Sequence, residues 1–272
     1  MEEKMYRVRG LDSFAKQERD LFQRIVYGKG TCQKEYNSNF DQIYMAFLTS
    51  RVSKDARLEG KVSKVRDCGG VDLQVFKGDN LEHVLARYEC AVEGYYYVNG
   101  DLASESFPIE STAVYVSLNI RHTERATKEM ILEVLKRKLN KLDIGKKCDI
   151  RRYLMKYSVR GWNMIDMDMP SKDDLIILKA IMDHYCDEFF VIKTKGGYHW
   201  IFHNQCLKEV REGDGGLHLL MKAYIDKGYL KSIDFGGTGM INNNGFTVVP
   251  GTIQRGHKVY FVRELCKGLE NY

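Results

Sequence analysis

Several features that define whole classes of protein are scarce or missing in this chain of 272 residues. Only three prolines accompany 24 glycines, which excludes a collagen-like or proline-rich protein. No apolar run reaches the roughly 18 residues that a membrane-spanning helix needs. The first residues, MEEKMYRVRG, lack the apolar stretch of a secretory signal peptide. We therefore expect a cytoplasmic protein with no membrane partner.

Cysteine is present, but in no pattern typical of a disulfide framework. The seven cysteines are an odd number and no Cys-x-x-Cys pair occurs, so reduced thiols are expected. Cys186 and Cys206 each lie near a histidine, as His184-x-Cys186 and His203-x-x-Cys206, which leaves a zinc cluster open. Because such irregular spacing is more typical of buried thiols beside unrelated histidines, zinc is not favoured.

The excess of positive charge is small. Lysine and arginine number 42 against 37 aspartates and glutamates, a net charge of +5 that permits a polyanionic partner without requiring one. The stretch from Arg51 to Arg66 is basic and suits a nucleic-acid contact, although a solvated face is the commoner explanation of such a run.

Hydrophobic patterning predicts both strands and helices. Residues 113–118 and 162–168 are typical of buried strands, and strands at 189–193 and 198–202 flank the turn Lys195-Gly196-Gly197. A hairpin indicates antiparallel pairing, so we expect an α+β fold with a mixed or antiparallel sheet backed by helices.

Helix signals lie between and around these strands. Ser171 and Asp174 have the spacing of a capping box, and Gly228 is placed to end a helix. A second pair of strands is expected at about 245–249 and 258–262. The predicted helices cover 14–27, 80–89, 123–142, 171–185 and 216–227.

Asp166 and Asp168 lie two residues apart in the strand at 162–168, so their carboxylates share one face. Two such groups repel each other unless a cation lies between them, and Mg²⁺ or Mn²⁺ is the natural choice. The alternative is a pair of solvated acids at the end of a strand.

Two later segments add groups suited to phosphates. The turn at 193–197 combines lysines with glycines whose amides can approach a ligand, and His199 begins the returning strand. Asp234 lies between apolar residues, and Arg255 follows a strand that ends in Pro-Gly and is suited to gripping a phosphate. A plain hairpin, a turn aspartate and a surface arginine are the alternatives.

In this order the three segments resemble the archaeo-eukaryotic primase superfamily, in particular the small primase-polymerase domains of plasmids and phages. Those domains carry a DxD or DxE strand, an SxH motif in a glycine-containing hairpin and a third acid after a hydrophobic residue. The resemblance covers roughly residues 111–262 and implies an RRM-like sheet backed by helices, with a smaller N-terminal α/β unit. We divide the chain into a catalytic core at 111–272 and an N-terminal unit of unknown role at 1–110.

The resemblance also implies roles for individual residues. Asp166, Asp168 and Asp234 would be the catalytic carboxylates that hold two divalent ions, and His199 would contact the phosphates of the incoming nucleotide. Gly197 stands where the family has serine, which leaves Thr194 as the nearest hydroxyl. Arg121, in the loop after the strand at 113–118, is a weaker candidate for a template contact. The remaining nucleotide-binding candidates are Lys195, Thr194, Gly196, Gly197 and Arg255.

Together these features predict a primase-polymerase that transfers a nucleotide from NTP or dNTP to a 3′-hydroxyl on a single-stranded DNA template. A separate helicase would be a partner, in the host cytoplasm if a phage or plasmid encodes the chain. Two alternatives stay open: an inactive single-stranded nucleic-acid-binding accessory protein, and a metal-dependent nuclease or nucleotidyltransferase with another acceptor. Dependence on a triphosphate separates them, because a polymerase requires it and a nuclease does not.

Overall fold

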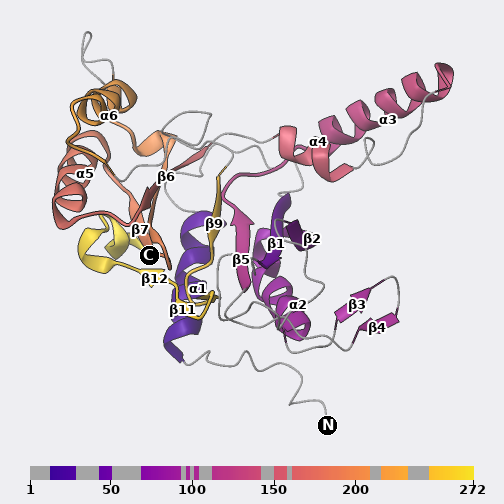
Figure 1. Ribbon diagram of the computed structural model, residues 1–272, viewed down its shortest axis with the longest axis horizontal. Helices are drawn as coiled ribbons and strands as arrows, with labels where there is room; N and C mark the ends of the chain where they lie inside the picture. The colour runs from indigo at the N-terminus through magenta and orange to yellow at the C-terminus, as the bar shows by residue number, and fades with distance from the viewer. Residues whose placement is uncertain are drawn as a thin grey trace.

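The computed structural model has a mixed α+β fold in which every described strand pairing is antiparallel (Figure 1). This confirms the coarse fold class expected from the hairpin.

The basic stretch Arg51 to Arg66 and Asp234 lie outside the described residues. In the described part of the chain, no helix is both long and apolar enough to cross a membrane. The structure describes residues 13–28, 43–50, 69–92, 96–98, 101–103, 112–141, 150–157, 161–208, 216–231 and 245–272.

The first sheet has four strands in the order β2-β1-β5-β9. β1 (Ile43–Ser50) and β2 (Gly69–Lys77) pair along their length, and β5 (Thr112–Ser117) pairs with the other edge of β1. β9 (Phe246–Val248), from the C-terminal part of the chain, pairs with β5 and forms the edge of this sheet opposite β2. Strands from both sides of residue 110 therefore share one sheet.

The second sheet also has four strands, in the order β12-β7-β8-β6. β7 (Phe190–Lys193) and β8 (Gly197–His203) form the predicted hairpin, and β6 (Trp162–Asp168) pairs with the whole of β8. β12 (Tyr260–Phe261) pairs with β7. The expectation that 245–249 pairs with 258–262 is wrong, because β9 and β12 belong to different sheets.

Helix boundaries follow local signals closely. The capping box is confirmed, since the backbone N–H of Asp174 donates to the Ser171 hydroxyl and that of Ser171 donates to the Asp174 carboxylate. Gly228 follows α6 with φ of 73°, as expected for a C-terminal cap. In the described part of the chain, the helices are α1 (Ser13–Val26), α2 (Leu81–Val92), α3 (Thr123–Leu139), α4 (Ile150–Lys156), α5 (Lys172–Tyr185) and α6 (Gly216–Asp226). Two further antiparallel pairs are β3 (Tyr96–Val98) with β4 (Asp101–Ala103) and β10 (Ile253–Gln254) with β11 (His257–Lys258).

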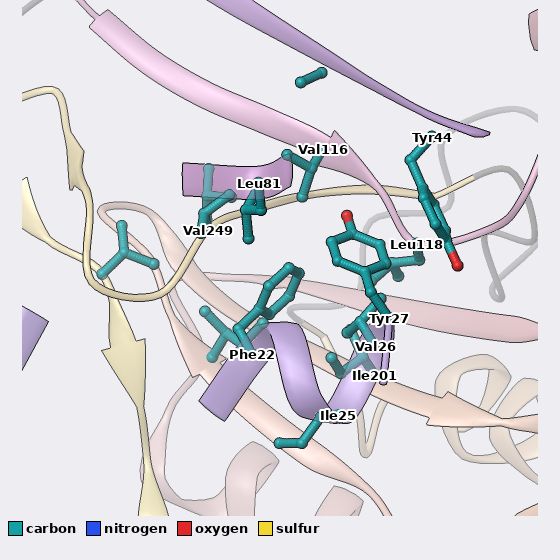
Figure 2. Close-up of a cluster of buried hydrophobic side chains, with 14 of the residues drawn as sticks. Phe22, Ile25, Val26, Tyr27, Tyr44, Leu81, Val116, Leu118, Ile201 and Val249 are labelled. Carbon is teal, nitrogen blue, oxygen red and sulfur yellow. The ribbon is translucent and has the colours of Figure 1, made fainter. Parts of the chain in front are cut away.

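The two faces of the second sheet pack against different layers. Because side chains alternate along a strand, Met164 and Ile201 share one face and belong to one buried cluster. In this cluster Ile201 lies with Phe22 of α1 and with residues of the first sheet (Figure 2). Trp200 lies on the opposite face and packs in the cluster that includes Met182 of α5 and Met221 of α6. The site described below lies on the first of these faces.

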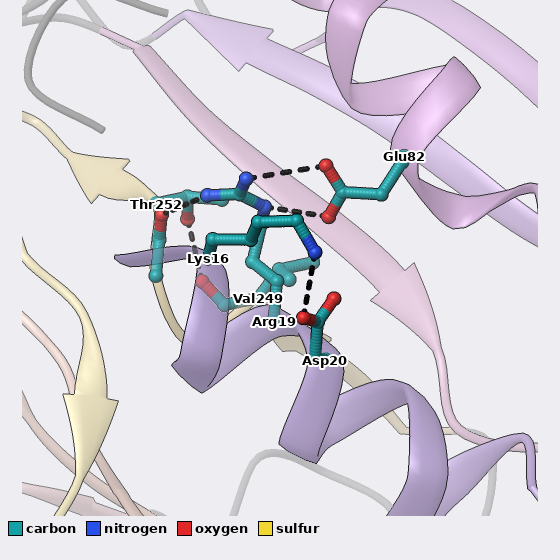
Figure 3. A network of polar contacts seen from close by, with 7 residues as sticks. Lys16, Arg19, Asp20, Glu82, Val249 and Thr252 are labelled. Atoms are coloured by element: carbon teal, nitrogen blue, oxygen red, sulfur yellow. Dashed lines mark hydrogen bonds and ion pairs between the residues drawn. The ribbon is translucent and has the colours of Figure 1, made fainter. Parts of the chain in front are cut away.

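Arg19 ties α1 to two distant parts of the chain (Figure 3). Its Nε and Nη2 donate to the two carboxylate oxygens of Glu82 on α2 at 2.6 and 3.1 Å. Its Nη1 donates to the carbonyl oxygen of Gly251 at 3.3 Å. The side chain is buried, so these bonds fix the turn after β9 against α1.

Candidate active site

The acid pair and the histidine predicted from sequence meet on one face of the second sheet. β6 and β8 pair so that Asp166 lies opposite His199, and Asp168 lies opposite Gly197. Deeper along the same face, Trp162 belongs to the buried core. The side chain of Asp166 is 42% exposed and Asp168 is exposed. A face that is apolar at one end of the sheet therefore becomes acidic and open at the other end.

His199 is buried, and groups lie close to both of its ring nitrogens. Nδ1 lies 2.8 Å from Oγ1 of Thr247, and Nε2 lies 3.5 Å from Oδ1 of Asp166. We assign the ring hydrogen to Nε2, because a carboxylate only accepts; Nδ1 then accepts from the Thr247 hydroxyl. The Thr247 hydroxyl has a second acceptor nearby, the carbonyl oxygen of Val248, but this oxygen is farther away, at 3.3 Å, than Nδ1 of His199. Burial lowers the pKa of His199 to about 4, so the ring is neutral at pH 7.

Thr247 is a site residue that sequence reasoning missed. It is fully buried on β9 of the first sheet, and its bond to His199 of the second sheet joins the two sheets at the site. The sequence shows only that a hydroxyl side chain interrupts the otherwise apolar strand Phe246–Val248. That signal does not say which group the hydroxyl meets, because the partner is 48 residues away in sequence.

The turn between β7 and β8 is closed by backbone and hydroxyl contacts. The N–H of Gly197 donates to Oγ1 of Thr194 at 3.0 Å, and the N–H of Thr194 donates to the carbonyl of Gly197 at 3.0 Å. Thr194 is buried, so its hydroxyl faces the turn. A Cβ atom on Gly197 would lie 1.7 Å from the carbonyl oxygen of Met167 on β6. This backbone therefore has no room for the serine that the family motif carries at this position.

A second turn packs beside the first. The N–H of Lys195 donates to Oε1 of Gln254 at 2.7 Å, and Nε2 of Gln254 donates to the hydroxyl of Tyr115 on β5 at 3.2 Å. Gln254 was not predicted as a site residue. It directly precedes Arg255, whose buried Nε has no hydrogen-bond partner within the described residues. The bond through Gln254 thus brings the Lys195 turn next to the turn that carries Arg255.

Arg121 is buried beside Phe246, the residue that precedes Thr247 on β9. Its side chain is 1% exposed, and its guanidinium carbon lies 5.2 Å from the ring centroid of Phe246. Burial lowers the pKa of Arg121 to about 10. In the same loop, Asn119 accepts hydrogen bonds from the N–H groups of Gly161 and Trp162 at 3.0 and 2.7 Å. This loop packs against the start of β6, and the structure offers no exposed Arg121 side chain for a template contact.

Among the described residues, the candidate donors for a metal ion at this site are the two carboxylates of the acid pair. Within the described ranges, no group of three or more His, Cys, Asp or Glu side chains is arranged to hold a metal ion, at Cys186 and Cys206 or elsewhere. Asp166 and Asp168 supply two carboxylates on one open face. Mg²⁺ commonly binds through one or two carboxylates together with waters and substrate phosphates, so this pair fits an ion that arrives with a triphosphate.

Comparison with known proteins gives no relative: no family model, no curated protein and no solved structure matches the chain. The functional interpretation therefore rests on the chemistry of the described residues and on the resemblance of the sequence motifs.

Proposed function

We propose that the protein is a metal-dependent nucleotidyltransferase of the primase-polymerase type, which adds NTP or dNTP to a 3′-hydroxyl on single-stranded DNA. The register of β6 and β8 carries the proposal, because it puts Asp166 and Asp168 on the same open face as a buried, neutral His199. Two turns with positive side chains, at Lys195 and Arg255, lie together at this edge. Carboxylates that can hold a metal ion, a neutral hydrogen-bond donor and positively charged side chains together suit a nucleoside triphosphate.

Each group has a separate task in this proposal. Asp166 and Asp168, with Asp234, would hold Mg²⁺ or Mn²⁺, which when bound lowers the pKa of the attacking hydroxyl and offsets phosphate charge. His199 donates from Nε2 to a phosphate oxygen while Thr247 holds its other nitrogen. Because His199 is neutral at pH 7, Lys195 and Arg255 supply the positive charge toward the triphosphate.

The proposal is tested by incorporation of labelled NTP and dNTP on single-stranded DNA, with and without a primer. The reactions contain Mg²⁺, Mn²⁺ or a chelator. We expect product that requires both a triphosphate and a divalent ion. DNA cleavage without triphosphate would instead assign a nuclease, and DNA binding without any product would assign an accessory protein. Either result would contradict the proposed activity.

Thr247→Val is expected to lower incorporation about tenfold at subsaturating nucleotide, since loss of a bond that orients a functional histidine typically costs about 10- to 100-fold. Valine keeps the shape of threonine but leaves Nδ1 of His199 without its donor at 2.8 Å. We expect mainly a higher KM for the nucleotide, measured in steady-state kinetics.

Thr247→Ser is the matched control, because it keeps the hydroxyl and should retain most of the activity. Equal kinetics for the valine and serine variants would show that the orientation of His199 does not depend on this bond.

A further inference from the structure

Met169, the residue that follows the acid pair, has an unusual backbone conformation. Its φ of 44° lies in the left-handed region, which residues other than glycine rarely adopt. Its N–H donates to the carbonyl oxygen of Gly196 at 2.8 Å, which joins the end of β6 to the turn at Lys195. Met169 therefore lies next to the carboxylate of Asp168 in the chain and next to the Lys195 turn in space.

The side chain of Met169 is open to solvent. At 87%, it is more exposed than any other large apolar side chain in the described part of the chain. Its packing therefore contributes little to the stability of the fold. The turn from β6 to α5 uses a left-handed conformation here, but glycine would adopt it at a lower cost. Neither the backbone nor the packing thus accounts for a methionine at this position.

Left-handed residues other than glycine are concentrated beside the candidate site. The described residues contain three of them, and two, Met169 and Arg255, border the site. The third, Lys141, lies just after the C-terminal end of α3, where a left-handed residue commonly ends a helix. Strained backbone conformations are typical of active sites and ligand clamps. The conformations of Met169 and Arg255 therefore indicate side chains that are held in place for a ligand.

The chemistry of the site indicates which part of a nucleotide suits Met169. In the proposed function, Lys195, Arg255 and the acid pair with its metal ion bind the triphosphate, which leaves the sugar and the base. A thioether carries no charge and makes favourable contacts with aromatic rings, with the sulfur about 5 Å from the ring. Every base has an aromatic face, so a contact of this kind is tolerant of sequence. The base is therefore the part of the nucleotide that matches Met169.

We propose that Met169 contacts the base of the bound nucleotide and raises its affinity without selecting among bases. This inference rests on the proposed function, because it takes the site to be a nucleotide site. The bond from the N–H of Met169 to Gly196 couples the base contact to the Lys195 turn, so one substrate molecule can meet both.

The test is isothermal titration calorimetry of the full chain in Mg²⁺ with ATP, CTP, dATP and dCTP, and separately with inorganic triphosphate. Met169→Gly should raise the dissociation constants of the nucleotides about three- to tenfold, because the contact with the base is lost. It should leave the dissociation constant of inorganic triphosphate unchanged, since this probe has no base. Met169→Leu keeps an apolar side chain of similar volume and should retain most of the affinity for nucleotides.

Lys141→Gly is the matched control. It also replaces a left-handed residue, with φ of 54°, by glycine, but it lies outside the site. Both glycine variants should unfold at the urea concentration of the wild type or at a higher one, because glycine adopts this conformation without strain. Only Met169→Gly should weaken nucleotide binding.

Equal affinity of Met169→Gly and the wild type for all four nucleotides would overturn the inference. So would an equal loss of affinity for nucleotides and for inorganic triphosphate, because Met169 would then act through the Lys195 turn. Failure of the proposed function gives a different result: a wild type that binds nucleotides but incorporates none would contradict the nucleotidyltransferase, while the variants would still decide the role of Met169. A wild type that binds no nucleotide would overturn both.

Discussion

Asp168→Asn is expected to lower the rate of metal-dependent nucleotide incorporation by about a thousandfold or more, because it removes a charge that holds the divalent ion. Asparagine keeps the size of the side chain. Since Asp168 is exposed at the end of β6, the free energy of unfolding should change by no more than about 0.5 kcal/mol. Asp166→Asn should have a similar effect on the rate.

Single-turnover incorporation at saturating metal and nucleotide measures this effect. Asp187→Asn is the control, because Asp187 also has an exposed carboxylate, with 71% of its side chain exposed, and lies outside the site. Asp168→Asn should lose activity while the control retains it. An unchanged rate in both Asp166→Asn and Asp168→Asn would exclude the acid pair as the metal-holding group, even if the protein proved to be a polymerase.

Gly197→Ala is expected to destabilise the protein by about 3 kcal/mol, the upper end of the usual cost of inserting a methyl group into a packed site. The added Cβ would lie 1.7 Å from the carbonyl oxygen of Met167. That atom belongs to the backbone of β6, so it can move only if β6 and β8 separate at this end. The separation would also displace Asp168, which lies opposite Gly197.

Urea unfolding measures the change, and the neighbouring glycine provides the control. A Cβ on Gly196 would meet only Oδ1 of Asp168 at 3.5 Å, an ordinary contact. Gly196→Ala should therefore change the free energy of unfolding by no more than about 0.5 kcal/mol. Equal stability of the two alanine variants would mean that β6 and β8 do not approach each other as closely as described.

Local features of the fold were predictable because local rules decide them. The capping box at Ser171, the strand at 162–168 and the hairpin between β7 and β8 follow from residues within a few positions of each other. Alternation along β6 likewise puts Asp166 and Asp168 on one face, whichever strands pair with β6. Sequence alone thus determined the acid pair and the strand that carries it.

Contacts between distant segments were not predictable in this way. β9 joins β5 and β12 joins β7, although spacing suggested that the two would pair with each other. Strand pairing depends on burying whole faces of a sheet, which periodicity within a single strand cannot specify. Periodicity likewise cannot specify that Arg121 is buried or that Leu135 of the amphipathic helix α3 is exposed, because both depend on packing between distant segments.

The candidate site combines both kinds of information. Its acids, its glycine turn and its histidine could be read from short motifs in the sequence. The pairing of Asp166 with His199, and the positions of Thr247 and Gln254 at 48 and 59 residues from their partners, depend on the packing of two sheets. The sequence by itself determined which chemical groups are present. Only the tertiary structure decided which of them meet, because register and sheet packing minimise buried polar groups and exposed apolar area over the whole chain at once.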